Sequence, residues 1–479
     1  MGNESSKEEN AVKLLNEDEK RDLEGVFAQL TTKEGDSKKK VDGTATFDYK
    51  AFKEFSKSIL PEDISQRLFN LMAHYSNDES RRAANRAALF VIASLIVKGS
   101  DAEKAMIFAH LGSASTGETI SSNDLQHLCC SLISAAFNSK SLHPRASVWG
   151  GKDPDSNRRL ARVFLDNASF QPDEEGNFTF DVPQLEKWLS ANSLIQRLFN
   201  AVFQGCFFSA STLASHDETD SAKAAMGELT DVASLDLNQP LLPRILKQKA
   251  HGPSGEESAG ESLLDATSVL FLNSHIPLKH RHLWRQLFSS VRDGESFARL
   301  TKEITGRGPT IVIVEDTDGY VFGGFASASW ETSPNFVGDD QCFLFTLNPH
   351  MAIYTPTGYN NHYMYFNQGQ QTIPNGLGMG GQHEYFGLWL DHDYGSGHSK
   401  AHPRSTTYNS PQLSKEEEFK IAKLEVWAVG LPVESQRVDG SVLDTNLDVQ
   451  VLIELFTGKA VSGLYEPKSV TQDDDDDEK

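Results

Sequence analysis

Histidine and carboxylate side chains, which are common metal ligands, gather in the stretch GGQHEYFGLWLDHDYGSGHSKAHP. They are His383, His392, His398, His402, Glu384, Asp391 and Asp393. His398 and His402 are four residues apart, but Gly397 precedes them and Pro403 follows, so no helix is expected to place both on one face. We therefore interpret this stretch as a loop of exposed histidines. A metal-dependent hydrolase that uses residues 383–402 is the enzymatic alternative.

Nucleophilic and phosphate-binding chemistry has little support elsewhere in the chain. There is no Gly-x-Ser-x-Gly elbow, and Cys342 lies in QCFLFTL, which predicts a core strand that is apolar on both faces. The glycines of NGLGMGG lack a following P-loop lysine or hydroxyl residue, so they predict tight turns and close backbone packing. Trp389 and Trp427 are expected in the core rather than in a ligand platform. The sequence therefore predicts no catalytic residue, no metal and no cofactor.

The amino terminus MGNESSKEEN carries a candidate lipid site. Gly2 and Ser6 fit the pattern Met-Gly-x-x-x-Ser/Thr of N-myristoylation. A single myristoyl chain binds membranes with an association constant on the order of 10⁴ M⁻¹, so a second attachment is needed. The net charge of -22 provides no basic surface for nucleic acid or anionic lipid, and no apolar run approaches the ~20 residues that span a bilayer. We expect a chain on the cytosolic side of a membrane.

The first half of the chain contains an internal repeat. DGTATFDYKAFKEFSKSILPEDISQRLFN, from Asp42, matches EGNFTFDVPQLEKWLSANSLIQRLFN, from Glu175, and STGETISSNDLQHL around Ile120 is similar. Each copy has the pattern of an EF-hand, which is a helix, a polar loop with a short extended segment and a second helix. The sequence predicts a flexible segment over residues 1–20 and a helical, EF-hand-like region over residues 21–250.

Calcium binding is not expected in these loops. With Phe47, Ile120 and Phe180 at loop position 8, position 12 lacks the bidentate glutamate that calcium favours, because it is occupied by Ala51, Asp124 and Gln184. The third loop comes closest to the calcium pattern, although Phe178 replaces its turn glycine. Its weak candidate ligands are Asp173, Glu175, Asn177 and Asp181. A calcium-myristoyl switch is therefore an alternative function.

The second half of the chain begins with a linker and two predicted helices and continues as a series of predicted strands. HGPSGEESAGES predicts a linker over residues 251–262. Helical spacing of Leu283, Trp284, Leu287 and Phe288 predicts a helix, and ESFARLTKEI predicts a second one. TIVIVEDTDGYVFGGFASA predicts a hairpin around Asp318 and Gly319, and CFLFTL, MAIYTP, HYMYFN, GLWLD and FKIAKLEVWAV predict further strands. The fold class is α+β, with an antiparallel β-sandwich flanked by helices.

These motifs resemble the TLDc domain, over about residues 263–430. The resemblance rests on LWRQLFSS, DGESFARL, GYVFGGFAS, FLFTL, NGLGMGG, GLWLD and LEVWAVG in family order. The family positions are Trp284, Gly294, Ser296, Phe297, Phe322, Gly323, Gly324, Gly378, Trp389, Glu425 and Trp427. We assign the TLDc domain to residues 263–431.

The resemblance implies a sandwich without an established catalytic centre. TLDc proteins associate with the vacuolar proton-pumping ATPase, so its peripheral sector is the implied partner. The amino-terminal glycine and the EF-hand-like half make the whole chain similar to lysosomal members linked to mTOR signalling, which implies mTOR signalling components as partners. Many members carry cysteine where this chain has Ser405, before Thr407 and Tyr408, so thiol redox activity at that position is in doubt.

Residues 432–479 predict a carboxyl-terminal helix and an acidic tail. Asn446 can cap a helix that ends at Gly458 and buries one apolar stripe. The stripe contains Leu447, Val451, Leu452, Leu455 and Phe456. It could pack on the sandwich or enter a partner's groove. The leading hypothesis is a non-enzymatic, myristoylated scaffold or regulator on the cytoplasmic face of the lysosomal membrane, bound to the proton pump.

Overall fold

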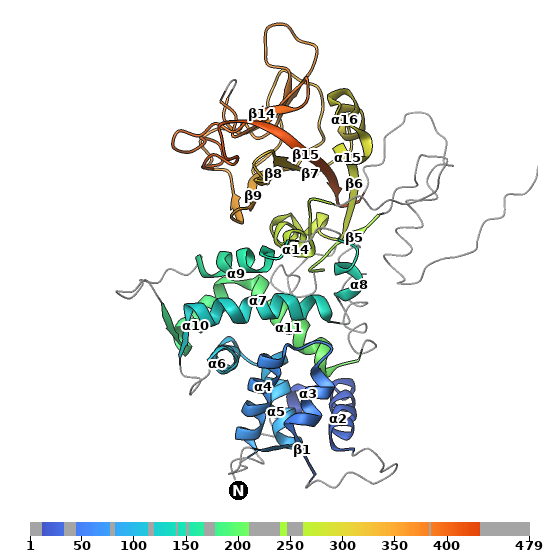
Figure 1. Ribbon diagram of the computed structural model, residues 1–479, viewed down its shortest axis with the longest axis vertical. Helices are drawn as coiled ribbons and strands as arrows, with labels where there is room; N and C mark the ends of the chain where they lie inside the picture. The colour runs from blue at the N-terminus through green and yellow to red at the C-terminus, as the bar shows by residue number, and fades with distance from the viewer. Residues whose placement is uncertain are drawn as a thin grey trace, which may run out of the picture.

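The computed structural model describes residues 12–32, 45–76, 82–113, 119–139, 142–149, 153–166, 178–209, 240–246, 262–382 and 385–431. A helical half is followed by a large antiparallel sheet structure, which confirms the predicted α+β class. Figure 1 shows the two parts stacked along the long axis, with helix α14 (Ala266–His275) between them.

The helical half consists of helices and four very short strands within the described residues. The helices are α2 (Glu17–Thr31), α3 (Tyr49–Ser56), α4 (Glu62–Tyr75), α5 (Arg86–Lys98), α6 (Asp101–Gly112), α7 (Ser122–Asn138), α8 (His143–Ala146), α9 (Ser156–Asp166), α10 (Val182–Ala191) and α11 (Ser193–Phe207). The strands are β1 (Thr46–Asp48), β2 (Ala83–Asn85), β3 (Thr119–Ser121) and β4 (Thr179–Asp181). β1 pairs with β2 and β3 with β4, both antiparallel.

Each short strand ends on the residue that caps the following helix. The side chains of Asp48, Asn85, Ser121 and Asp181 accept a hydrogen bond from the third backbone N–H of α3, α5, α7 and α10. Such caps contribute about 1 kcal/mol each, since they satisfy backbone donors that the helix itself leaves unpaired. The strand therefore fixes where its helix begins.

The chain contains one more of these units than the sequence indicated. The centres of three strands are the predicted apolar residues Phe47, Ile120 and Phe180, whereas β2 has Ala84 opposite Phe47. A small alanine gives no hydrophobic signal, although its side chain is fully buried. The pairing agrees with two sets of helix–strand–helix units; the likeness to EF-hands stays an interpretation of that layout.

The second half is built around one long path of strands. Its helices are α14, α15 (Ser290–Asp293) and α16 (Phe297–Ile304), with a 3₁₀ turn at Leu278–His280. Its strands are β5 (Arg244–Ile245), β6 (Leu283–Ser289), β7 (Thr310–Asp316), β8 (Val321–Ala326), β9 (Phe343–Asn348), β10 (Ala352–Tyr354), β11 (Tyr365–Asn367), β12 (Gly376–Met379), β13 (Leu388–Asp391), β14 (Ser396–His398) and β15 (Glu418–Val429). The strand order is β10-β9-β8-β7-β15-β14-β13-β12-β11, and β6 joins β15 to β5.

Strand β15 belongs to both layers of the sandwich, the first of which contains β5 to β10 and the second β11 to β14. Residues Glu418 to Lys420 pair with β14, whereas Ile421 to Val429 pair with β7 and β6. The two layers face each other, because a Cβ added to Gly324 on β8 would lie 2.3 Å from Sδ of Met379 on β12. The core between the layers includes Val312, Leu344 and Leu377, all fully buried.

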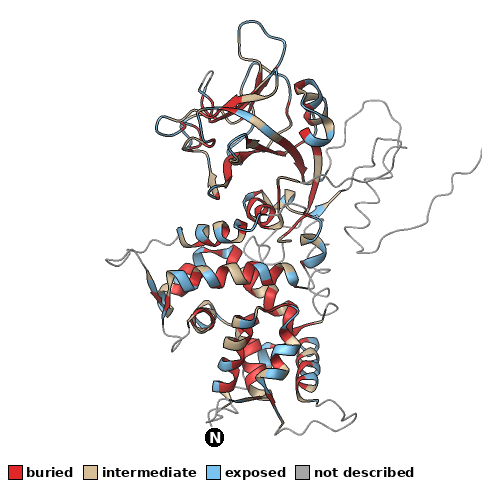
Figure 2. Ribbon diagram, viewed as in Figure 1, coloured by how far each residue is buried: buried red, intermediate tan, exposed pale blue. Residues whose placement is uncertain are grey.

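Alternate residues of the first layer face opposite cores. On β7, Ile311 and Ile313 belong to the core shared with the helical half, whereas Val312 and Val314 belong to the core between the layers. Side chains alternate between the two faces of a strand, so a sheet covered on both faces needs an unbroken apolar run. Figure 2 shows buried residues on the central strands and on the helices that face them. The predicted hairpin is confirmed by pairing of β7 with β8, with Gly319 at φ 81° in its turn.

Two predicted elements were wrong. Residues 283–289 form strand β6 rather than a helix, since they pair with β15 and β5 and are mostly buried. Their apolar pairs at helical spacing reflect burial on both faces of a strand, and short apolar runs do not separate the two cases. The glycines of NGLGMGG form strand β12 rather than turns alone. Close backbone packing is confirmed there, because a Cβ on Gly376 would lie 2.4 Å from the carbonyl oxygen of Leu390.

Candidate functional site

Three tryptophans meet where the helical half joins the sheet. The ring of Trp149, which follows α8, lies 5.1 Å from Trp427 on β15 and 5.7 Å from Trp284 on β6, measured between centroids. All three residues are buried. The cluster is part of one continuous apolar core that contains residues of α2 to α7, α9 to α11, α14 and the sheet. The two halves therefore share a single core.

A buried carboxylate ties the start of the TLDc region to the sheet. Glu425 is 3% exposed, and it accepts hydrogen bonds from Ser262 Oγ, Leu263 N and Trp427 Nε1, each 3.0 Å long. Burial raises the pKa of Glu425, while the hydrogen bonds from these partners act to lower it. Removing this side chain would leave buried donors without an acceptor. Glu425 and Trp427 are thus structural family positions at the junction.

Residues 240–246 cross the same junction as a strap. Asn273 of α14 donates to the carbonyl oxygens of Pro240 and Leu241 at 3.2 and 3.3 Å, and Arg145 of α8 donates to that of Leu242 at 3.1 Å. The Leu242 side chain is fully buried. Strand β5 then runs parallel to β6, with Arg244 N donating to His282 O at 2.9 Å. Helices α8 and α14 and the sheet edge are therefore joined by one segment.

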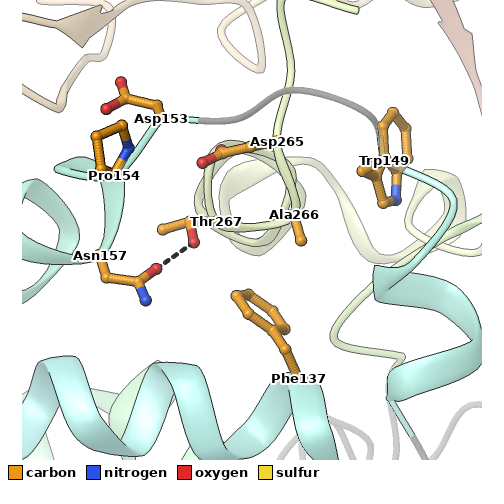
Figure 3. A pocket seen from close by; sticks show the side chains of 8 residues that line it. All are labelled: Phe137, Trp149, Asp153, Pro154, Asn157, Asp265, Ala266 and Thr267. Atoms are coloured by element: carbon orange, nitrogen blue, oxygen red, sulfur yellow. Dashed lines mark hydrogen bonds between the residues drawn. The ribbon is translucent and has the colours of Figure 1, made fainter.

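Two adjoining hollows lie beside this junction. The first has a volume of about 340 Å³ and is lined by residues of α7, α9 and α14, together with Trp149. Figure 3 shows Phe137 and Trp149 beside the first turn of α14, with Thr267 donating to the Asn157 side chain across it. The second, of about 470 Å³, extends toward β7 and β9 and shares Asp153, Pro154 and Asp265 with the first. We call the two together the junction groove.

The predicted histidine stretch does not form one cluster. His398 on β14 is buried and stacks at 5.9 Å on Trp389, so the expectation that all these histidines are exposed was wrong for it. Burial lowers the pKa of His398. His392 and His402 are exposed, and His402 lies 3.2 Å from Glu417. His383 and Glu384 lie outside the described residues. Within the described part of the chain, no three histidine, cysteine or carboxylate residues are placed to hold a metal ion.

An aromatic cluster occupies the sheet around that histidine. Phe386 stacks on Trp389 at 4.5 Å, and Tyr365 lies 5.6 Å from Phe386. The indole N–H of Trp389 donates to Asp391 at 2.6 Å. Gly378 is needed beneath this cluster, because a Cβ there would lie 2.7 Å from the Phe386 ring. These residues therefore form a small core of their own, separate from the core between the layers, and Trp389 is buried in it as expected.

The remaining TLDc positions also have structural roles. Gly294 adopts φ 84° after α15, and Ser296 caps α16 by accepting from Arg299 N at 3.3 Å. Phe297 and Phe322 are buried in the core between the layers. A Cβ on Gly323 would lie 1.9 Å from the carbonyl oxygen of Val312. Cys342 is buried, and burial raises the pKa of its thiol.

Several predicted sites fall outside the described residues. These are Gly2, the calcium candidates Asp173, Glu175 and Asn177, and the stripe Leu447, Val451, Leu452, Leu455 and Phe456. Asp181 is described, and its Oδ1 accepts from Gln184 N at 2.8 Å as the cap of α10. Among the helices that the structure describes, none combines the length and apolar character needed to cross a bilayer.

Sequence reasoning missed Trp149, the strap and the junction groove. Trp149 is a lone tryptophan in ASVWGGKDP, and a two-residue strand such as β5 carries no periodicity. The role of Trp149 and the pairing of β5 each depend on contacts between segments far apart in the chain. The paired tryptophans of LWRQLF and LEVWAV were the available signal that a large apolar surface surrounds them.

Comparison with known proteins agrees with this architecture. The family model of the TLDc domain matches residues 257–430. MTOR-associated protein MEAK7 of Gallus gallus is 37% identical over 100% of both chains, and that of Homo sapiens is 38% identical over 86% of this chain and 87% of that protein. Nuclear receptor coactivator 7 of Homo sapiens is 33% identical over 34% of this chain and 17% of that protein. The chain therefore carries a TLDc domain and belongs to the MEAK7 family of TLDc proteins.

Proposed function

We propose that this chain is a non-enzymatic regulator or scaffold in mTOR-linked nutrient or stress signalling. Its similarity extends over the full length of a protein named for association with mTOR, so the proposal draws on more than the shared TLDc domain. The names of the MEAK7 relatives describe an association rather than a reaction. Partners would include mTOR signalling components.

The observation that carries the scaffold proposal is the shared core of the two halves. Residues of the helical half and of the sheet belong to one apolar cluster, closed by Trp149, Trp284 and Trp427. Partners on either half would therefore be held in a defined relation to each other. A catalytic role would need convergent reactive groups, whereas the TLDc positions described above cap helices and pack the core.

We further propose that the chain resides on the cytoplasmic face of the lysosomal membrane and binds the peripheral sector of the vacuolar proton-pumping ATPase. This rests on the TLDc domain and on Gly2 in a myristoylation pattern. A weak lipid attachment and a weak protein attachment act together, since each raises the effective concentration for the other. Association with the lysosome would then need both.

Flotation of the myristoylated full chain with lysosomes tests the membrane part. Intact lysosomes are compared with lysosomes stripped of the pump's peripheral sector. Loss of the chain on stripping supports the pump as partner, whereas unchanged flotation contradicts it. Gly2→Ala should reduce lysosomal association without abolishing it, and complete retention would remove the lipid from the proposal.

Co-purification tests the signalling part separately. Full-length chain is captured from cells that have been starved and then refed, and mTOR is measured in the bound fraction. Enrichment over a matched TLDc protein without the helical half supports the proposal. Equal recovery with both proteins would show that the full-length similarity carries no mTOR association.

A further inference from the structure

We propose that the acidic carboxyl-terminal run of this chain, residues 473–478, binds a basic rim at one end of the first layer of the sandwich. The basic rim consists of Arg244, Lys279, Arg281 and Arg307. The occupant of this surface is therefore a segment of the same chain. The inference is independent of membrane attachment and of mTOR association.

The four cations of the basic rim lie at the same end of four neighbouring strands. β5 runs parallel to β6, and β15 runs antiparallel to β6 and β7, so the starts of β5, β6 and β7 meet the end of β15. Arg244 is the first residue of β5, and Arg307 lies shortly before β7. Lys279 and Arg281 lie in the turn that leads into β6. Neighbouring strands are about 4.8 Å apart, so the sheet itself gathers these cations.

Two cations of the basic rim are available to an anion. Lys279 and Arg307 are exposed, and neither forms an ion pair with any residue that the structure describes. The guanidinium of Arg281 is held in place, because it donates to two carbonyl oxygens of the preceding turn at 2.7 and 2.8 Å. Residues 274–286, which contain Lys279 and Arg281, include no carboxylate. The rim is therefore a preformed positive surface.

Carboxylates elsewhere near this end of the sheet do not cancel the basic rim. Glu303 is paired with Arg299 at 3.2 Å, and Glu331 lies beside the loop that carries Arg307. Asp339–Asp340 precede β9, which β7 and β8 separate from β15 by about 14 Å. That separation exceeds the screening length of ~8 Å at physiological ionic strength. Four cations with Glu331 beside them leave an excess positive charge.

The carboxyl-terminal segment leaves the sheet at the basic rim. Directly after β15, Gly430 N donates to Leu283 O at 2.8 Å. Gly430 adopts φ 82°, and an added Cβ would collide with the ring of His280. The chain thus turns closely over the residue that separates Lys279 from Arg281. Figure 1 shows this end of β15 beside β6. Residues that follow Gly430 therefore start next to the cations.

The same segment carries a complementary anion. Residues 473–478 have the sequence DDDDDE, in which every side chain is a carboxylate. The chain from Leu431 to Asp473 extends by up to ~3.3 Å per residue, so it is long enough to return to the rim. A tethered partner acts at an effective concentration that can reach the order of millimolar, which a separate acidic protein would have to exceed. The tether and the charge together favour the chain's own acidic run as the occupant.

Fluorescence anisotropy with the purified full chain tests the proposal. The probe is a fluorescein-labelled peptide of residues 468–479, and its control has asparagine and glutamine in place of aspartate and glutamate. The receptors are the wild-type chain and a neutralised chain, in which the same replacements are made at residues 473–478. The acidic peptide should bind the neutralised chain saturably and the wild-type chain at least about tenfold more weakly, because the wild-type run occupies the rim. The control peptide should bind neither chain.

Substitutions in the neutralised chain locate the binding surface. Lys279→Gln together with Arg307→Gln should weaken the acidic peptide by at least about tenfold. Lys50→Gln together with Lys187→Gln is the matched control, because it removes two exposed cations of the helical half and changes the net charge equally. This control pair should leave the affinity within about twofold. Circular dichroism should be the same for all these chains.

Three results with the peptide would overturn the proposal. They are no binding to either chain, equal binding to both chains, and equal weakening by the rim pair and the control pair. Flotation with phosphatidylserine vesicles tests a lipid headgroup as the occupant. If the neutralised chain binds these vesicles through Lys279 and Arg307 but does not bind the acidic peptide, the rim is a membrane contact and the proposal is overturned as well.

Discussion

The indole nitrogen of Trp427 donates to the carboxylate of Glu425, two residues earlier on strand β15, at 3.0 Å. The same carboxylate accepts from Ser262 and Leu263, which precede helix α14. The two family positions therefore form one unit that holds the start of the TLDc region against its last strand. Because Trp427 also contacts Trp149, this unit lies where the helical half meets the sheet.

Replacing Glu425 should reveal a pH-dependent contribution to stability. Its pKa is raised in the folded chain, so the protonated form is favoured there and the side chain's contribution falls as pH rises through the folded pKa. Glu425→Gln keeps the shape without the buried charge. Relative to Glu425→Gln, the wild-type chain should therefore lose stability as pH rises above the ordinary carboxyl pKa of 4.5. Urea unfolding at several pH values measures this difference.

Two controls accompany that experiment. Glu418→Gln, at an exposed position on the same strand, should leave the pH profile unchanged. Glu425→Ala leaves buried donors unpaired and should cost about 1–3 kcal/mol at low pH, and its difference from the wild-type chain should shrink as pH rises. A wild-type chain whose stability relative to Glu425→Gln is constant with pH would contradict the raised pKa.

Asp181 should behave as a helix cap. Asp181→Ala removes the bond from Gln184 N and should lower stability by about 1 kcal/mol, whereas Asp181→Ser, which preserves an acceptor, should restore most of it. Thermal melting of the full chain, with and without calcium, measures both effects. Calcium that stabilises the wild-type chain but not Asp181→Ser would favour a ligand role for this residue and revive the calcium switch.

The adjacent glycines of β8 should tolerate alanine very differently. At Gly323 the added Cβ meets the carbonyl oxygen of Val312 at 1.9 Å, and backbone on a paired strand cannot yield cheaply. At Gly324 it meets the Met379 side chain at 2.3 Å, which can change rotamer. Gly324→Ala should cost about 1–3 kcal/mol, and Gly323→Ala more. Denaturant unfolding of both variants checks the order; equal costs would argue against the observed register.

Detaching the strap should loosen the sheet edge locally. Leu242→Asp places a charge in a fully buried position, so residues 240–246 should separate from α14 and β6. Hydrogen exchange should then speed up at Arg244 and Leu246, whose N–H groups donate to the carbonyl oxygens of His282 and Trp284, while amides of β8 and β9 stay protected. Leu242→Val, which keeps an apolar side chain at the buried position, is the matched control. Uniformly faster exchange throughout the sheet would instead indicate global unfolding.

Sequence patterns predicted those parts of the fold in which the paired strands are neighbours in the chain. The Asp318–Gly319 turn predicted the β7–β8 hairpin, because the turn and both strands are contiguous in sequence. Strand β6 was missed because its identity depends on β15, more than a hundred residues away in the chain. Its apolar pairs fit a helix equally well until that partner is known. β2 escaped notice because alanine carries almost no hydrophobic signal.

The same distinction between local and long-range contacts decided which residues of the candidate site could be predicted. Trp427 and Glu425 could be identified because they lie in one family motif. Trp149 could not, since its role depends on ring contacts with β6 and β15 that no local spacing encodes. The histidine stretch shows the reverse error. Proximity in sequence suggested one loop, but pairing of β14 with β13 and β15 turns His398 inward while His402 stays exposed.

The core shared by the two halves has a practical consequence for fragments of this protein. A chain cut near Ser262 would present to water the face of the sheet formed by Ile311, Ile313, Phe325 and Phe345, which the intact chain buries. An apolar surface of this kind promotes aggregation. A truncated domain that fails to bind a partner would then report poor solubility rather than a missing binding site. Single substitutions in the full-length chain are the safer way to map its surfaces.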